Sequence, residues 1–127
     1  MIQKARGTSG FRLLDTLEDL YEYTHNATML FPKSERHVLA AQIRNTNIEL
    51  IRLVIAAARK YYKKTTLQEM DIELDVMRVL VRTSYNMRYI NGHKYEVWTG
   101  KIRDVGNMLG KWLNTLRSQT GEQAPCK

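Results

Sequence analysis

Residues 95–116 read YEVWTGKIRDVGNMLGKWLNTL. Bulky apolar residues recur in this segment at alternating spacings of three and four, at Tyr95, Trp98, Ile102, Val105, Leu109, Trp112 and Leu116. An α-helix turns ~100° per residue, so this spacing places all of them on one face. The segment therefore predicts an amphipathic helix whose apolar face packs against other helices.

Three earlier segments carry the same pattern in a region that is almost free of helix breakers. Between Phe11 and Asn91 there is no glycine, and the only proline is Pro32. We therefore expect helices over about residues 11–30 and 35–62, and a third from about residue 67 to a break at 89–92. Their apolar positions are Leu13, Leu17, Leu20, Thr24, Ala27 and Phe31 in the first helix, and Leu67, Met70, Leu74, Met77, Val81 and Tyr85 in the third.

Side-chain oxygens mark the expected helix starts. Ser34 is placed to cap the second helix, and Asn91 is placed to cap the fourth. Thr66 and Glu69 form the spacing of a capping box, which predicts the start of the third helix.

The predicted architecture is a single domain. Four helices of about 20–28 residues joined by short turns must lie antiparallel to their neighbours. The fold class is therefore all-α, an up-down antiparallel four-helix bundle over residues 11–118. We expect a flexible leader at residues 1–10 and a disordered tail at 119–127. A chain of 127 residues needs neither a metal nor a disulfide to hold such a core.

Composition bounds the compartment and the class of partner. The single cysteine, Cys126, cannot form an internal disulfide, which favours a reducing compartment. The longest run without Asp, Glu, Lys or Arg is residues 23–32, too short for a membrane helix, and residues 1–10 lack the apolar centre of a secretory signal. We expect a cytoplasmic protein without a membrane partner. The net charge of +7 favours polyanions, although a basic surface can also serve only solubility.

The second helix is more apolar than one bundle seam requires. Its apolar residues sweep about 220° of the helix surface, and a bundle interior fills about half of that arc. The third helix adds Ile72, Val76, Val79, Leu80 and Met87 away from its main seam. This surplus predicts either an oligomer interface or a well-filled monomer core. The candidate interface residues are Ile48, Ile55, Ile72 and Val79.

No pattern for a metal, a cofactor or catalysis is present. A di-iron bundle needs Glu-x-x-His on two helices, but only Glu22 and His25 match, because Ser34 and Ile90 precede the other histidines by three. Covalent haem and zinc sites need more cysteines or clustered histidines than this chain has. We expect no cofactor and no enzymatic activity.

Positive charge is concentrated in the second helix. Residues 33–64 hold eight basic and two acidic residues. If the helix runs to residue 62, Arg52, Arg59 and Lys63 form one basic stripe. The segment RKYYKK, residues 59–64, has two readings: compensation of the helix dipole with the tyrosines in the core, or a phosphate-contacting cluster with a tyrosine that stacks on a base.

Arg78 lies about 40° from the Leu74 seam, so we expect it to be partly buried or at an interface. No base-reading motif is present, so any nucleic-acid binding should depend on charge and shape. The candidate contacts to nucleic acid or polymerase are Arg44, Arg52, Arg59, Lys60, Lys63, Lys64, Arg78 and Arg82.

Several segments resemble the accessory variability determinant family of diversity-generating retroelements. They are FPKSERH at 31–37, IRNT at 43–46, residues 67–82 with the core DIEL at 71–74, and VGNMLGKW at 105–112. The resemblance spans about residues 11–117. A sister group of four-helix bundles, encoded in intervening sequences of 23S ribosomal RNA genes, is similar as well.

The resemblance implies a small basic bundle that assembles into a pentameric barrel without catalysis of its own. It also implies association with the reverse transcriptase of the element and its template RNA, with cDNA as a second candidate ligand, in support of error-prone cDNA synthesis (mutagenic retrohoming). The leader and the tail carry no family pattern.

Two function hypotheses therefore compete. One is a nucleic-acid-binding accessory of a polymerase. The other is a structural homo-oligomeric module of the 23S intervening-sequence type, without a polymerase partner, whose charge only keeps it in solution.

Overall fold

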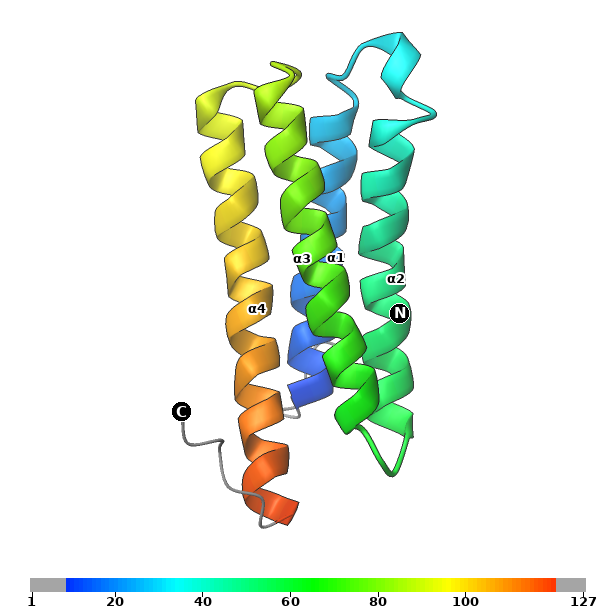
Figure 1. The fold of residues 1–127 in the computed structure, drawn as a ribbon, viewed down its shortest axis with the longest axis vertical. Helices are drawn as coiled ribbons and strands as arrows, with labels where there is room; N and C mark the ends of the chain where they lie inside the picture. Colours follow the sequence, from blue (N-terminus) through cyan, green and yellow to red (C-terminus); the bar gives the residue numbers. More distant parts are fainter. Residues whose placement is uncertain (1–8, 121–127) are drawn as a thin grey trace.

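The computed structural model describes residues 9–120 and folds them into four long helices that run side by side (Figure 1). The helices are α1 (Ser9–Thr28), α2 (Leu39–Arg59), α3 (Lys64–Asn86) and α4 (Gly92–Thr120). One turn of 3-10 helix, η1 (Lys33–Glu35), lies between α1 and α2. No strand occurs within residues 9–120. The prediction of an all-α four-helix bundle is confirmed for this range.

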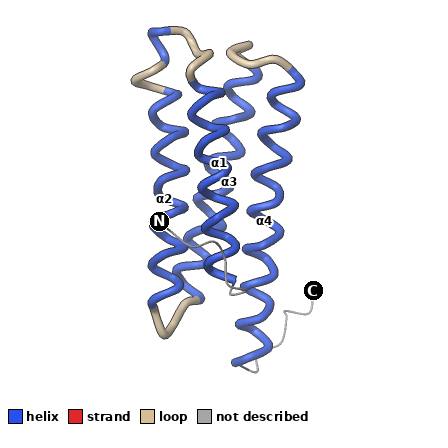
Figure 2. Tube along the Cα trace, turned by 180° about the vertical axis from the view of Figure 1, so that it is seen from behind, coloured by secondary structure: helices blue, strands red, loops and turns tan. Residues whose placement is uncertain are grey.

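Each helix packs against two others. Helices α1 and α3 both contact α2 and α4, so the four form a closed ring in chain order. Figure 2 shows the α1–α2 and α3–α4 connections at one end of the bundle and the α2–α3 turn at the other. The expected leader and tail fall mainly on residues 1–8 and 121–127, which lie outside the described range. Ser9 and Gly10 are already helical, and α4 continues to Thr120.

The predicted seams form the core. The six positions named for the first helix are all buried, as are five of the six in α3. Tyr85 is the exception at 40% exposure, and its ring stacks on Tyr95 at a centroid distance of 4.5 Å. In α4, five of the seven positions are buried, while Tyr95 and Leu116 are half-buried at the two ends of the seam.

Helix α2 begins at Leu39, later than the predicted residue 35. Ser34 does not cap it, because Pro32 starts the separate turn η1, in which the Glu35 N–H donates to the Pro32 carbonyl at 2.8 Å. Tertiary contacts hold this connection. The Phe31 ring packs against Tyr89 at 5.3 Å, and Glu35 hydrogen-bonds to Tyr89.

The turn between α2 and α3 also differs from the prediction. Helix α2 ends at Arg59 because Lys60 adopts an extended backbone with ψ of 149°. Helix α3 begins at Lys64, so Thr66 lies inside its first turn and forms no capping box. The expected cap at Asn91 is confirmed, since its Oδ1 accepts the Lys94 N–H at 2.8 Å.

Candidate nucleic-acid interface

The outer face of α2 carries two exposed arginines. Arg52 and Arg59 are seven residues apart, which places them on the same side of the helix about two turns from each other. Arg52 pairs with Glu49 at 3.2 Å, but the Arg52 side chain is still 68% exposed, so the pair leaves most of the guanidinium accessible. The predicted third member, Lys63, is not on this face because α2 ends at Arg59.

Two lysines of the following turn bind the helix ends on either side, Lys63 the end of α2 and Lys60 the start of α3. The Lys63 ammonium donates to the Ala57 carbonyl at 2.8 Å and also to the Lys60 carbonyl. Lys60 donates to the Thr66 hydroxyl at 2.9 Å. Cations at this position satisfy carbonyls that have no partner within the helix and oppose the negative end of its dipole. For Lys63, the interpretation that the segment 59–64 compensates the helix dipole is therefore confirmed.

The tyrosines of this turn are not in the core. Tyr61 is 85% exposed and Tyr62 is 83% exposed, so the prediction that accompanied dipole compensation, with both tyrosines in the core, is wrong. Their rings lie edge to face at a centroid distance of 4.6 Å. They became solvent-facing because the chain leaves helical geometry at Lys60.

The remaining cations fall into two groups. Arg44 and Arg78 are half-buried: Arg44 donates to the Thr28 hydroxyl at 3.4 Å, and Arg78 pairs with Asp75 at 2.5 Å. The Arg78 guanidinium lies over Gly106 of α4, where a Cβ would come within 2.6 Å of it. The expectation that Arg78 is partly buried is confirmed. Arg82, one turn further along α3, and Lys64 at its start are exposed.

The four candidate interface residues lie on the surface of the single chain. Ile48 and Ile55 are 39% and 42% exposed and share the side of α2 with Arg44, which faces α1. Ile72 and Val79 are 66% and 46% exposed on α3. The core of one chain therefore does not bury these four residues, whereas Leu80 of the same surplus packs against it.

A family model described as bAvd-like matches residues 12–116, a range that includes parts of all four helices. The chain belongs to the bAvd-like family. This family is that of the bacterial accessory variability determinants, which are accessory proteins of diversity-generating retroelements. None of the curated proteins is similar to the chain.

This bAvd-like bundle holds a buried polar network that the sequence analysis did not foresee. The Thr24 hydroxyl donates to Asn47 Oδ1 at 3.2 Å and accepts the Trp98 indole N–H at 3.2 Å. Asn47 Nδ2 donates to the Leu17 carbonyl at 3.3 Å. The network joins α1, α2 and α4. Asn47 could have predicted this network from the sequence, because an amide at a buried seam position needs hydrogen-bond partners.

Electrostatics between α2 and α3 differ from those on the outer face. Burial, and next the charge of Glu49, raise the pKa of Glu73. Glu49 thus acts on Glu73 of α3 as well as pairing with Arg52, whereas the exposed Arg59 forms no ion pair within residues 9–120.

The described residues 9–120 contain neither a metal-binding cluster nor a membrane-spanning helix. No three His, Cys, Asp or Glu side chains in this range lie close enough together to hold a metal ion. None of the helices in the same range has the apolar length that crossing a membrane requires.

Proposed function

We propose that this protein is a non-catalytic accessory subunit of a diversity-generating retroelement, binding template RNA through its basic surface. The observation that carries the proposal is the set of exposed cations on α2 and at the start of α3, Arg52, Arg59 and Lys64, in a chain of the bAvd-like family. The net charge of +7 adds a long-range field that attracts polyanions.

The proposed partner is the reverse transcriptase of the same element. A protein that binds both the polymerase and its template raises their effective concentration toward the millimolar range, and this requires no catalytic group. The cDNA product carries the same backbone charge as the template, so the same surface is suited to both.

We also propose that the protein is a homo-oligomer, with a pentamer as the expected state. Ile48, Ile55, Ile72 and Val79 support this because the single chain leaves them exposed. Sedimentation equilibrium should show one closed oligomer. Val79→Glu should lower its mass, while the exposed control Gln68→Glu should not; a monomer at tens of micromolar would refute the assembly.

The RNA test uses charge reversal matched for total charge. Arg52→Glu, Arg59→Glu and Lys64→Glu together should weaken RNA binding across unrelated sequences. Each lost phosphate contact should flatten the dependence of log K on log salt by ~0.7–0.9. The control reverses Arg12, Arg103 and Lys111, which are exposed on α1 and α4. Equal weakening by both sets would mean that net charge alone, not this surface, governs binding.

The polymerase test measures cDNA. Template-primed cDNA should be made by the cognate reverse transcriptase in the presence of this protein and should fall when the triple variant of α2 and α3 replaces it. Equal yield and start site with and without the protein would refute the accessory role and favour the structural module.

A further inference from the structure

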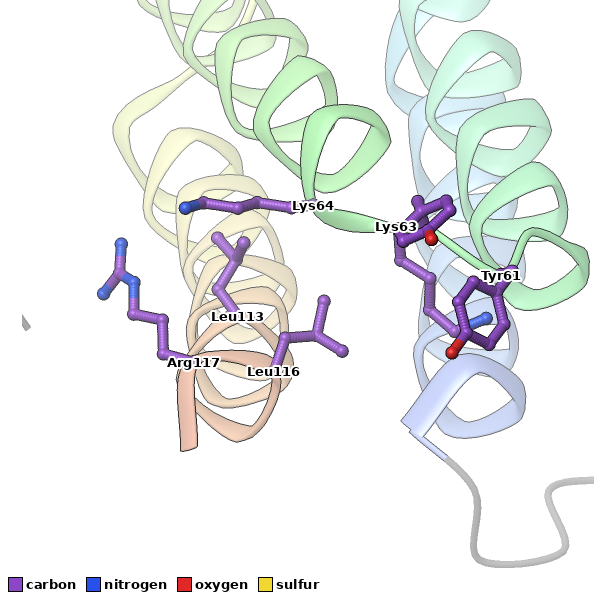
Figure 3. Close-up of a pocket in the computed structure, with 7 residues that line it drawn as sticks. Tyr61, Lys63, Lys64, Leu113, Leu116 and Arg117 are labelled. Atoms are coloured by element: carbon purple, nitrogen blue, oxygen red, sulfur yellow. The ribbon is translucent and has the colours of Figure 1, made fainter. Parts of the chain in front are cut away.

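A cleft lies between the end of α4 and the α2–α3 turn (Figure 3). Leu113 and Leu116 of α4 line one part of it, and Tyr61 and Tyr62 of the turn line another. Its volume is about 210 Å³. A cavity of ~150 Å³ is already large enough to hold benzene, so this cleft has room for a larger aromatic ring.

The unequal lengths of the helices explain why an apolar cleft forms here. Helix α4 has 29 residues and α3 has 23, so at ~1.5 Å per residue α4 is roughly 9 Å longer. Figure 1 shows α4 extending past the ends of α1 and α3. Leu113 and Leu116 continue the apolar side of α4 into this overhang and remain half-buried.

The turn presents its tyrosines on a fixed backbone. The two bonds from the Lys63 ammonium tie the turn to the end of α2. Tyr61 and Tyr62 lie directly before this anchored residue and expose most of their rings. Exposed rings on an anchored turn can stack on an incoming base with little further ordering of the backbone.

The charged residues of the described range 9–120 that line the cleft are all basic. They are Lys63, Lys64 and Arg117, and no acidic residue of this range lines it. Lys63 donates to the Ala57 and Lys60 carbonyls, which holds its ammonium at the end of α2. Arg117 donates to Asn114 Oδ1 at 3.3 Å, and its side chain and that of Lys64 both line the cleft and add positive charge there. Figure 3 shows both side chains extending to the same side of α4, with Leu113 and Leu116 between them and Tyr61.

We propose that this cleft receives one unpaired base of a single-stranded nucleic acid, with the neighbouring phosphates at Lys64 and Arg117. The proposal rests on the proposed RNA-binding function and specifies its ligand. An occupant needs both a flat ring for the tyrosines and leucines and negative charge for the cations, and an unpaired nucleotide carries both. A duplex keeps its bases stacked inside, so its rings cannot enter.

The test compares three fluorescent probes that carry the same number of phosphates, with the full-length protein at one salt concentration. They are single-stranded RNA, an abasic phosphodiester strand of the same length, and a duplex RNA with half as many base pairs as the single strand has nucleotides. Single-stranded RNA should bind about tenfold more tightly than the abasic strand. Tyr61→Leu with Tyr62→Leu should abolish that difference and leave the salt slope unchanged. The control Tyr85→Leu, at the opposite end of the bundle, should preserve it.

The outcomes separate this inference from the proposed function. Equal affinity for single-stranded and abasic probes, or for single-stranded and duplex RNA, would overturn the base cleft while leaving electrostatic RNA binding intact. No binding of any probe would overturn both. A further competitor is a peptide of alternating Glu and Phe with the same charge as the single strand. If this peptide displaces the single strand and binds the tyrosine double variant more weakly, the cleft is a site for a protein partner and the inference is overturned.

Discussion

Replacing Thr24 by valine should destabilise the bundle far more than its change in shape suggests. The two side chains are nearly isosteric, but the hydroxyl donates to Asn47 Oδ1 and accepts the Trp98 indole N–H, and all three residues are fully buried. Two buried polar groups would lose a partner, each at a cost of ~1–3 kcal/mol, and the added methyl group returns roughly 0.8 kcal/mol. We expect a net loss of about 2–4 kcal/mol in the free energy of unfolding.

Urea denaturation at a fixed protomer concentration measures this loss, because self-association would otherwise shift the midpoint. The matched control is Thr115→Val, on the exposed side of α4, whose hydroxyl donates only to the Lys111 carbonyl of its own helix. Its effect should stay within about 0.5 kcal/mol. A double-mutant cycle with Trp98→Phe should show strong non-additivity, since both changes remove the same bond. A loss below about 1 kcal/mol for Thr24→Val, or full additivity, would refute the energetic role of the network.

Three further predictions concern single positions. Glu73→Gln should raise the free energy of unfolding at pH 7, because burial and the charge of Glu49 raise the pKa of this carboxyl and penalise its charged form. This gain in stability over the parent protein should vanish as the pH falls through that raised pKa toward about 4. A stability difference that persists at low pH would contradict this cause. Gly110→Ala should add about 0.5–1 kcal/mol to the free energy of unfolding, because nothing lies within 4 Å of the new Cβ. Gly106→Ala should stabilise the protein less, since its Cβ would meet the Arg78 guanidinium. Thermal unfolding of both variants compares the two effects. Arg88 has a φ of 67°, so Arg88→Gly should stabilise the protein by about 0.5–1 kcal/mol in the same assay, and a loss would show that the side chain matters more than the backbone strain.

Periodicity was sufficient for the helices and most of the core. The alternation of three and four in α4 predicted a buried face that includes Trp98, Ile102 and Leu109. This signal is strong because burial along a long helix repeats many times, so no single local exception changes the assignment.

The ends of α2 were not predictable from local capping rules. At its start, Phe31 and Glu35 contact Tyr89 of the α3–α4 connection, so a tertiary contact prevails over the capping preference of Ser34. At its other end, Lys63 reaches back to the helix carbonyls, and this contact depends on a turn geometry that spacing does not define.

These end errors also limited the prediction of the candidate site. A helix extended to residue 62 places Lys63 on a stripe with Arg52 and the tyrosines near the core. The structure instead ends the helix at Arg59 and exposes Tyr61. Arg117 was not singled out, because only the three-dimensional structure brings the end of α4 beside this turn.

The two ends of the bundle should differ in how easily they open. At one end, contacts to Tyr89 tie both connections together. At the other, a single turn faces the overhanging last turns of α4 (Figure 1). Local opening requires least free energy where fewest contacts break, so amide hydrogen exchange should begin in that overhang. A ligand that bridges α4 and the turn would suppress this opening, which couples the protection of the α4 amides to occupancy of the cleft.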